Sequence, residues 1–142
     1  MNKSRGTIVL EQIKEIVEAT KLFKQVSFGR VKEISEEDVF NSCYIIEFEE
    51  EVEHDGTVSD NTCSYDRRMI VDFHLNLSFE YDLEYKDIQA YFDRIMLQDG
   101  EFWTKAGILD RVPMYVAWDN NEYFDDGKKQ GMLRYQIWYR TI

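Results

Sequence analysis

The sequence predicts a small α+β domain with one mainly antiparallel sheet, an N-terminal helix, and a second helix between two β-hairpins. Three observations predict this fold class. Apolar and polar residues alternate over residues 67–80, apolar residues recur at helical spacing in two other segments, and shorter strand-like segments lie on either side. The length of 142 residues favours a single α+β domain over residues 1–142.

Two segments have the periodicity of amphipathic helices. The first is expected at about residues 7–22, with Thr7 as its candidate N-cap, and the second at about residues 83–97, with Asp82 as its candidate cap. Because such helices bury one apolar stripe, both are expected to pack on the sheet. The stripes consist of Val9, Ile13, Ile16 and Val17 in the first helix and of Ile88, Tyr91, Phe92 and Ile95 in the second.

Five segments have the composition of strands. They are a short one at residues 26–31 and longer ones at residues 43–52, 67–80, 112–118 and 133–139. The polar stretch at residues 54–64 contains Asp55-Gly56 and predicts a hairpin loop before the third strand. Pro113 suits a strand start or a sheet edge, because proline cannot donate a ladder hydrogen bond.

The alternating run at residues 67–80 is the most informative segment. All residues between its apolar positions are polar except Ile70, and the apolar positions are Met69, Val71, Phe73, Leu75, Leu77 and Phe79. At roughly 3.3 Å per residue the run would reach about 40–45 Å, more than the core of this domain needs. We therefore expect it to bend or to project as a hairpin, and we expect the function to lie in assembly. The candidates for subunit contacts are Arg67, Arg68, Asp72 and His74, although the two arginines could instead pair with acidic neighbours within the chain.

The charge balance is strongly negative. The formal net charge is -11, from 28 acidic and 17 basic residues, which argues against simple binding to nucleic acid or to an anionic membrane. It still allows a surface past which DNA slides without adhering. The acidic run consists of Glu47, Glu49, Glu50, Glu51, Glu53 and Asp55. A solvated strand end is the favoured interpretation, a channel or rim surface that repels phosphate is the second, and a cation site is the weakest, because the glycine pattern of a calcium loop is missing.

No motif of a catalytic or cofactor site occurs in the sequence. The seven glycines form neither a dinucleotide fingerprint nor a phosphate loop, and His54 and His74 are the only histidines. Cys43 and Cys63 are the only cysteines and form no CxxC, so the sequence predicts no zinc site and no cofactor, and favours a reduced, intracellular protein. Neither a signal peptide nor an apolar run long enough for a membrane helix is indicated.

The order of these elements is similar to that of a known family. An amphipathic helix leads into Val26-Ser27-Phe28-Gly29-Arg30, and an acidic turn at Ser35–Asp38 precedes the strand that begins with Cys43-Tyr44-Ile45-Ile46-Glu47-Phe48. A polar loop, the alternating strand that begins with two arginines, a second amphipathic helix and two closing strands follow. Over nearly its whole length the chain resembles the tail terminator (tail completion) proteins of long-tailed bacteriophages.

The resemblance implies a structural protein that is not an enzyme. Members of that family assemble as rings, typically hexameric, that cap the tail tube, end its polymerisation and provide the head-tail joining surface. The implied partners are further copies of the chain, the tail tube protein and the head-tail connector protein, with DNA passing through without specific binding and with no membrane. The implied location is the tail or neck of the virion, after assembly in the host cytoplasm.

Other functions compete with this interpretation. The nearest alternative is a different phage neck or head-tail connector protein, or a tail tube protein. A tube protein polymerises without limit, whereas a terminator closes into a ring. An acidic DNA-mimic inhibitor belongs to another class and should carry carboxylates spaced along helices, whereas here they gather at strand ends and loops. An enzyme would have to rely on His74 or on an acidic pair.

Overall fold

The computed structural model describes residues 2–29, 41–52, 58–59, 62–63, 66–78, 83–98, 100, 103, 107–118 and 128–140. Asp82, the acidic turn at Ser35–Asp38, and the acidic residues Glu53 and Asp55 lie outside these residues.

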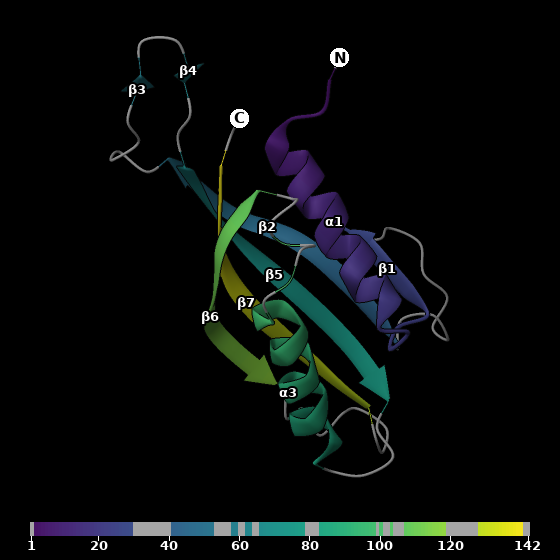
Figure 1. Cartoon of the computed structure of the whole chain (residues 1–142). Helices are drawn as coiled ribbons and strands as arrows, with labels where there is room; N and C mark the ends of the chain where they lie inside the picture. Colours follow the sequence, from purple (N-terminus) through teal and green to yellow (C-terminus); the bar gives the residue numbers. More distant parts are fainter. Residues whose placement is uncertain are drawn as a thin grey trace.

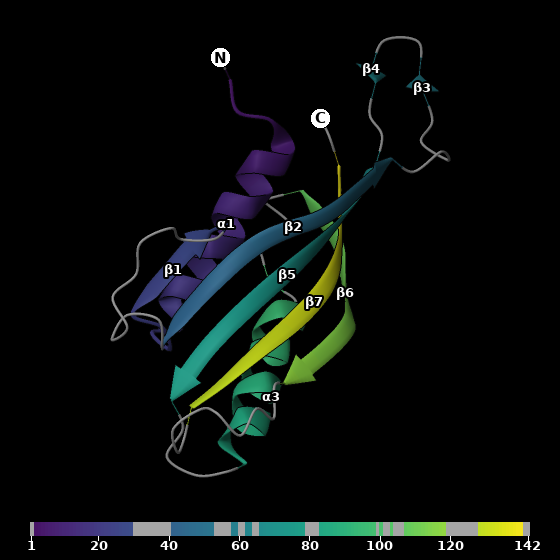
Figure 2. The ribbon, with the colours of Figure 1, turned by 180° about the vertical axis from the view of Figure 1, so that it is seen from behind.

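A five-stranded sheet with helices on one face forms the body of the molecule (Figures 1 and 2). Its strand order is β1-β2-β5-β7-β6, with β1 at Gln25–Phe28, β2 at Ser42–Val52, β5 at Asp66–Ser78, β6 at Ile108–Trp118 and β7 at Lys128–Arg140. Only β1 and β2 run parallel among these neighbours. Helices α1 (Arg5–Ala19) and α3 (Glu84–Leu97) cover the same face (Figure 1). The predicted α+β fold class is confirmed, including the second helix between two hairpins.

The polar loop expected at residues 54–64 contains a short ladder of its own. Strands β3 (Val58–Ser59) and β4 (Thr62–Cys63) pair antiparallel with each other and form a separate two-stranded sheet. In Figure 1 this ladder lies beyond the ends of β2 and β5, outside the main sheet.

Helix α1 begins earlier than the sequence predicts. The Thr7 amide donates a hydrogen bond of 3.2 Å to the Ser4 side-chain oxygen, so Ser4 is the N-cap and the prediction of Thr7 is wrong. At the other end, the Thr20 hydroxyl donates to the Val17 carbonyl over 2.7 Å, and the chain leaves the helix through Lys21 at a φ of 58°. The side chains of α1 that are fully buried against the sheet are Val9, Ile13 and Val17.

An aromatic cluster joins α3 to the sheet. The rings of Phe73 on β5 and Phe92 on α3 have centroids 4.9 Å apart, and Tyr135 on β7 meets Phe73 edge-on at 5.7 Å. The Tyr135 hydroxyl donates a hydrogen bond to Asp93, which ties the polar end of this ring to α3. Burial, together with the carboxylate of Asp93, raises the pKa of the Tyr135 hydroxyl, so it stays protonated and remains a donor.

Strand β5 is the central strand of the sheet and does not project from it. It pairs with β7 from Asp66 to Ser78 and with β2 from Arg67 to Asn76. Alternation with period two predicts one buried and one wet face, and this prediction is wrong for much of the strand, because Ile70, Asp72 and Asn76 are only 4% to 7% exposed. Side chains from both neighbouring strands flank these residues, and such shelter is available only to a central strand.

Replacing Phe73 with Ala should lower the free energy of unfolding by about 3–5 kcal/mol, because a fully buried ring is lost from the aromatic cluster. The matched control is His74→Ala, the next residue on the opposite face, which should change it by less than about 1 kcal/mol. Urea titrations of both variants measure the difference. A Phe73→Ala variant as stable as the wild type would contradict this placement of the core.

Candidate interaction surfaces

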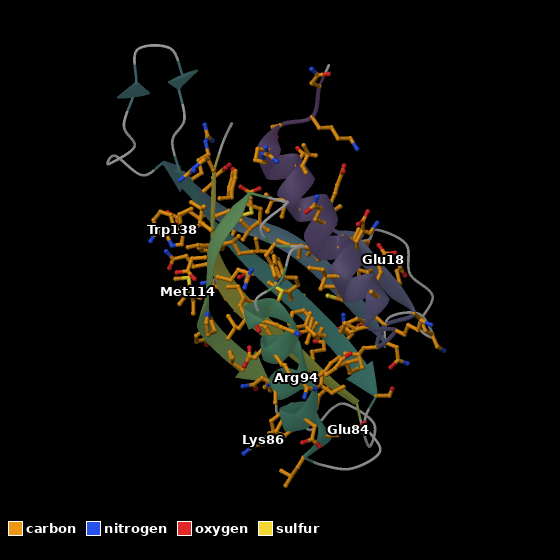
Figure 3. All side chains as sticks on the ribbon, in the orientation of Figure 1. Glu18, Glu84, Lys86, Arg94, Met114 and Trp138 are labelled. Atoms are coloured by element: carbon orange, nitrogen blue, oxygen red, sulfur yellow. The ribbon has the colours of Figure 1, made fainter. Side chains whose placement is uncertain are left out.

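The edge strand β6 carries several exposed apolar side chains. It pairs with β7 on one side and has no strand neighbour on the other side within the described part of the chain. Nine large apolar side chains are exposed among the described residues, and five of them lie on β6 at 38% to 54% exposure: Leu109, Val112, Met114, Tyr115 and Val116. The side chain of Met114 lies at the β6 side of the molecule, away from α1 (Figure 3). An unpaired apolar edge invites another strand.

Two bulges and the edge position of β6 explain the exposure of its apolar side chains. The pairing with β7 shifts between Ile108 and Asp110 and again between Pro113 and Tyr115, so Leu109 and Met114 fall on bulges. Regular alternation would place Met114, Val116 and Trp118 on one face of the strand. A bulge changes the direction of the side chains, so these three residues do not form one continuous face. The edge position fits Pro113, as the sequence predicted.

The face of the sheet opposite the helices is open (Figure 2). At its centre Arg134 on β7 makes two hydrogen bonds to Asp72 on β5, of 2.6 and 2.9 Å. The same guanidinium lies 4.0 Å from the ring centroid of Phe48 on β2. Two predicted contact residues are therefore engaged within the chain, because Asp72 pairs with Arg134 and Arg68 lies over the Trp138 ring at 5.8 Å.

Two adjacent shallow cavities surround His74 on this open face. Their volumes are about 350 and 270 Å³, and they share His74, Gln130 and Gly131. The first also contains Tyr44, whose buried hydroxyl has no hydrogen-bond partner among the residues that the structure describes. Neither lining holds a carboxylate, a serine or a cysteine among the described side chains. His74 is the titratable side chain that the two linings share.

A third cavity, of about 340 Å³, contains a pair of carboxyl groups beside the N-terminus of α1. In a regular strand residues 47 and 50 would point to opposite faces, but the bulge of β2 between Glu47 and Glu49 brings both toward α1. The Tyr139 hydroxyl donates a hydrogen bond to Glu50, and Arg67 Nη1 lies 3.5 Å from Glu50 Oε1. The predicted contact residue Arg67 is thus placed against an acid of its own chain.

The surroundings of Glu47 favour its protonated form. Partial removal from water raises the pKa of Glu47, and the charge of Glu50 and a hydrogen bond between the two carboxyl groups raise it further. Burial and the same Glu50 carboxylate raise the pKa of Tyr139, so its hydroxyl remains a donor. The packing is close, because a Cβ at Gly6 would come within 2.9 Å of the Tyr139 hydroxyl oxygen.

In its described part the acidic run is divided. Glu47 and Glu50 line the cavity beside α1, whereas Glu49, which pairs in register with Ile70, is not among the residues that line it. The sequence does not predict which acidic residues line the cavity, because the bulge that places them depends on the register of two strands. The apolar, uncharged stretch at residues 112–118 is the sequence feature that corresponds to the exposed edge of β6, but the same pattern is typical of an ordinary strand.

Two comparisons of the sequence with known proteins find no relative of this chain. No protein-family model matches it, and a search of the curated proteins finds no match. None of the helices that the structure describes is long and apolar enough to cross a membrane. Over the described ranges, no three or more His, Cys, Asp and Glu side chains are grouped so that they could hold a metal ion.

Replacing Arg134 with Met should lower the free energy of unfolding by about 3–5 kcal/mol, because the carboxylate of Asp72 stays buried without its charge partner. The control is the double variant Asp72→Leu with Arg134→Met, which removes both charges and should recover most of the loss. Thermal and urea unfolding measure both. Equal stability of the single and double variants would contradict the predicted cost of leaving the Asp72 carboxylate without its partner.

Replacing Glu47 with Gln should change how stability depends on pH. The raised pKa of Glu47 means that the folded chain holds this proton more tightly than the unfolded chain, whose value is about 4.5. The protonated Glu47 side chain therefore stabilises the folded chain fully at pH values below its usual pKa. This stabilisation is lost as the pH rises through the raised pKa of Glu47 in the folded chain. The melting temperature of Glu47→Gln relative to wild type should increase from acidic to neutral pH. A relative melting temperature that falls over this range would contradict the assignment.

Proposed function

We propose that the protein is a structural subunit that closes into a hexameric ring, caps a phage tail tube, ends its polymerisation and joins it to the head connector. It has no catalytic role in this proposal. The observation that carries the proposal is the unpaired edge of β6, with its five exposed apolar side chains. Such an edge is an aggregation hazard for a monomer and becomes a stable contact when another chain covers it.

Charge supports the same conclusion. Copies of a chain with a net charge of -11 repel each other, so they can associate only where the local charge is low. The segment Val112–Trp118 contains no charged residue. By contrast, the labelled charged side chains Glu18 on α1 and Glu84, Lys86 and Arg94 on α3 lie on the helices (Figure 3). The helical side thus suits water, and the β6 side suits a neighbour.

The negative balance also suits a ring that lets DNA pass. Like charges keep phosphate from adhering to a channel wall over a range of about 8–10 Å at physiological salt. In this proposal the partners are the tail tube protein and the head connector protein, and the location is the neck of the virion. A tail tube subunit, the nearest alternative, would continue to polymerise where a terminator stops.

The variant Met114→Glu should weaken ring formation at least about tenfold, because a charge in the middle of the apolar edge must be desolvated and faces its own copies. Its melting temperature as a monomer should stay near that of the wild type, since the side chain is exposed. The control is Leu83→Glu, which adds the same charge at an exposed apolar position beside α3 and should leave the ring intact. Native mass spectrometry measures the stoichiometry of each variant.

A second measurement tests the phage role itself. Purified wild-type protein added to growing tail tubes should bind their ends and stop elongation, and Met114→Glu should do so less well. A wild-type chain that stays monomeric at high concentration and also leaves tube growth unchanged would overturn the proposal. Open-ended filaments of the chain alone would favour a tube subunit, and binding to a DNA-processing enzyme in place of tubes would favour the DNA-mimic alternative.

A further inference from the structure

We propose that the β3–β4 ladder of one copy docks on the free edge of β6 in the next copy, so that the ring closes through head-to-tail strand contacts. This inference rests on the proposed function and names the two surfaces that meet. Both surfaces belong to one chain and lie at different places on it, which is the arrangement that a ring requires.

The ladder is too small to be stable alone. Each of its strands has two residues, and within the described part of the chain neither strand belongs to the main sheet. A two-stranded hairpin is marginal in water, whereas a third strand or a packed surface stabilises it. Among the described residues the ladder therefore has no further strand neighbour, and it lies at the end of β2 and β5, beyond the sheet (Figure 1).

The edge of β6 would also be stabilised by an additional strand. Its backbone has no strand neighbour on one side in the described ranges, and its apolar side chains stay exposed on the isolated chain. Adding a strand to such an edge satisfies the backbone and covers the side chains in one contact. The other edge of the sheet, β1, offers four residues, against eleven in β6.

Charge does not oppose this pairing. The ladder strands Val58–Ser59 and Thr62–Cys63 contain no charged residue, and neither does Val112–Trp118, although some other parts of the chain, such as residues 73–79, are also uncharged. The chain as a whole carries 28 acidic and 17 basic residues, so uncharged strands are where two copies approach without repulsion. The rival pairing is β6 with β6 of a second copy, which has two-fold symmetry and gives a dimer in place of a ring.

Disulfide trapping separates the two pairings, because Cys63 already lies on β4. Cysteine is introduced singly by Val112→Cys, Met114→Cys or Val116→Cys, and the assembled protein is oxidised mildly. A disulfide needs Cα atoms within about 7 Å, so only strands in contact are linked. Cys43 does not interfere, because it is fully buried and burial raises the pKa of its thiol.

At least one of the three positions should give cross-linked species up to the size of the whole ring. The control repeats the experiment in a Cys63→Ser background, where these species should disappear. Cross-links that persist without Cys63 would establish the β6–β6 pairing and overturn the proposal. An intact ring with no cross-link at any of the three positions would overturn it as well.

A mixing experiment gives an independent test. One variant lacks Val58–Cys63, so it offers β6 without the ladder, and Met114→Glu offers the ladder without a usable edge. Each alone should be monomeric with a wild-type melting temperature, and both mixed should yield a heterodimer and nothing larger, because one productive contact remains. A ladder-deleted chain that still forms the ring would sink this pairing and leave the proposed function intact. A wild-type chain that forms no ring would sink both.

Discussion

The pairing of β5 on both of its sides is the constraint on which the rest of the molecule depends. Because β2 and β7 occupy its two edges along nearly its full length, its alternation sends one set of side chains to the helices and the other to the open face. The first set forms the core with α1 and α3. The second set is sheltered by its neighbours, and the buried Asp72 consequently needs Arg134 as a charge partner. The same pairing leaves β1 and β6 as the edges, so exposed backbone is confined to the margins of the sheet.

The fold class could be predicted from the sequence because it follows from local periodicity. Alternation along residues 67–80 and 133–139, and helical spacing in two other segments, survive in the structure as β5, β7, α1 and α3. The error at the start of α1 has a local cause, since Ser4 and Thr7 are both good N-caps and composition does not choose between them. The shelter of the polar face of β5 could not be predicted, because it depends on the strand order, which brings residues far apart in sequence together.

The candidate surfaces depend on features that leave little trace in a single sequence. Three bulges determine which side chains form these surfaces. One in β2 turns Glu47 and Glu50 to the same face, and two in β6 expose Leu109 and Met114. A bulge arises from a mismatch between two strands, so neither strand contains the information alone. For the same reason the apolar residues of β6 were indistinguishable from core residues. What marks them as surface is that no strand lies beyond β6 in the described sheet.

The chains repel one another through their net negative charge but can adhere through the apolar edge of β6. These two effects together can explain why an assembly of such chains would stop growing. Repulsion between chains of net charge -11 is screened within about 8–10 Å at physiological salt, so it resists loose aggregation but yields to close apolar contact. If each copy offers one apolar edge and one ladder that fits it, closure of a ring uses both in every copy. No adhesive edge then remains, and the outer surface is again dominated by like charge. A tube subunit would have to keep a further adhesive surface at each end of its ring. Four of the five exposed apolar residues of β6 lie within Val112–Val116, and this edge is one of the two complementary surfaces that each copy in a closing ring must offer.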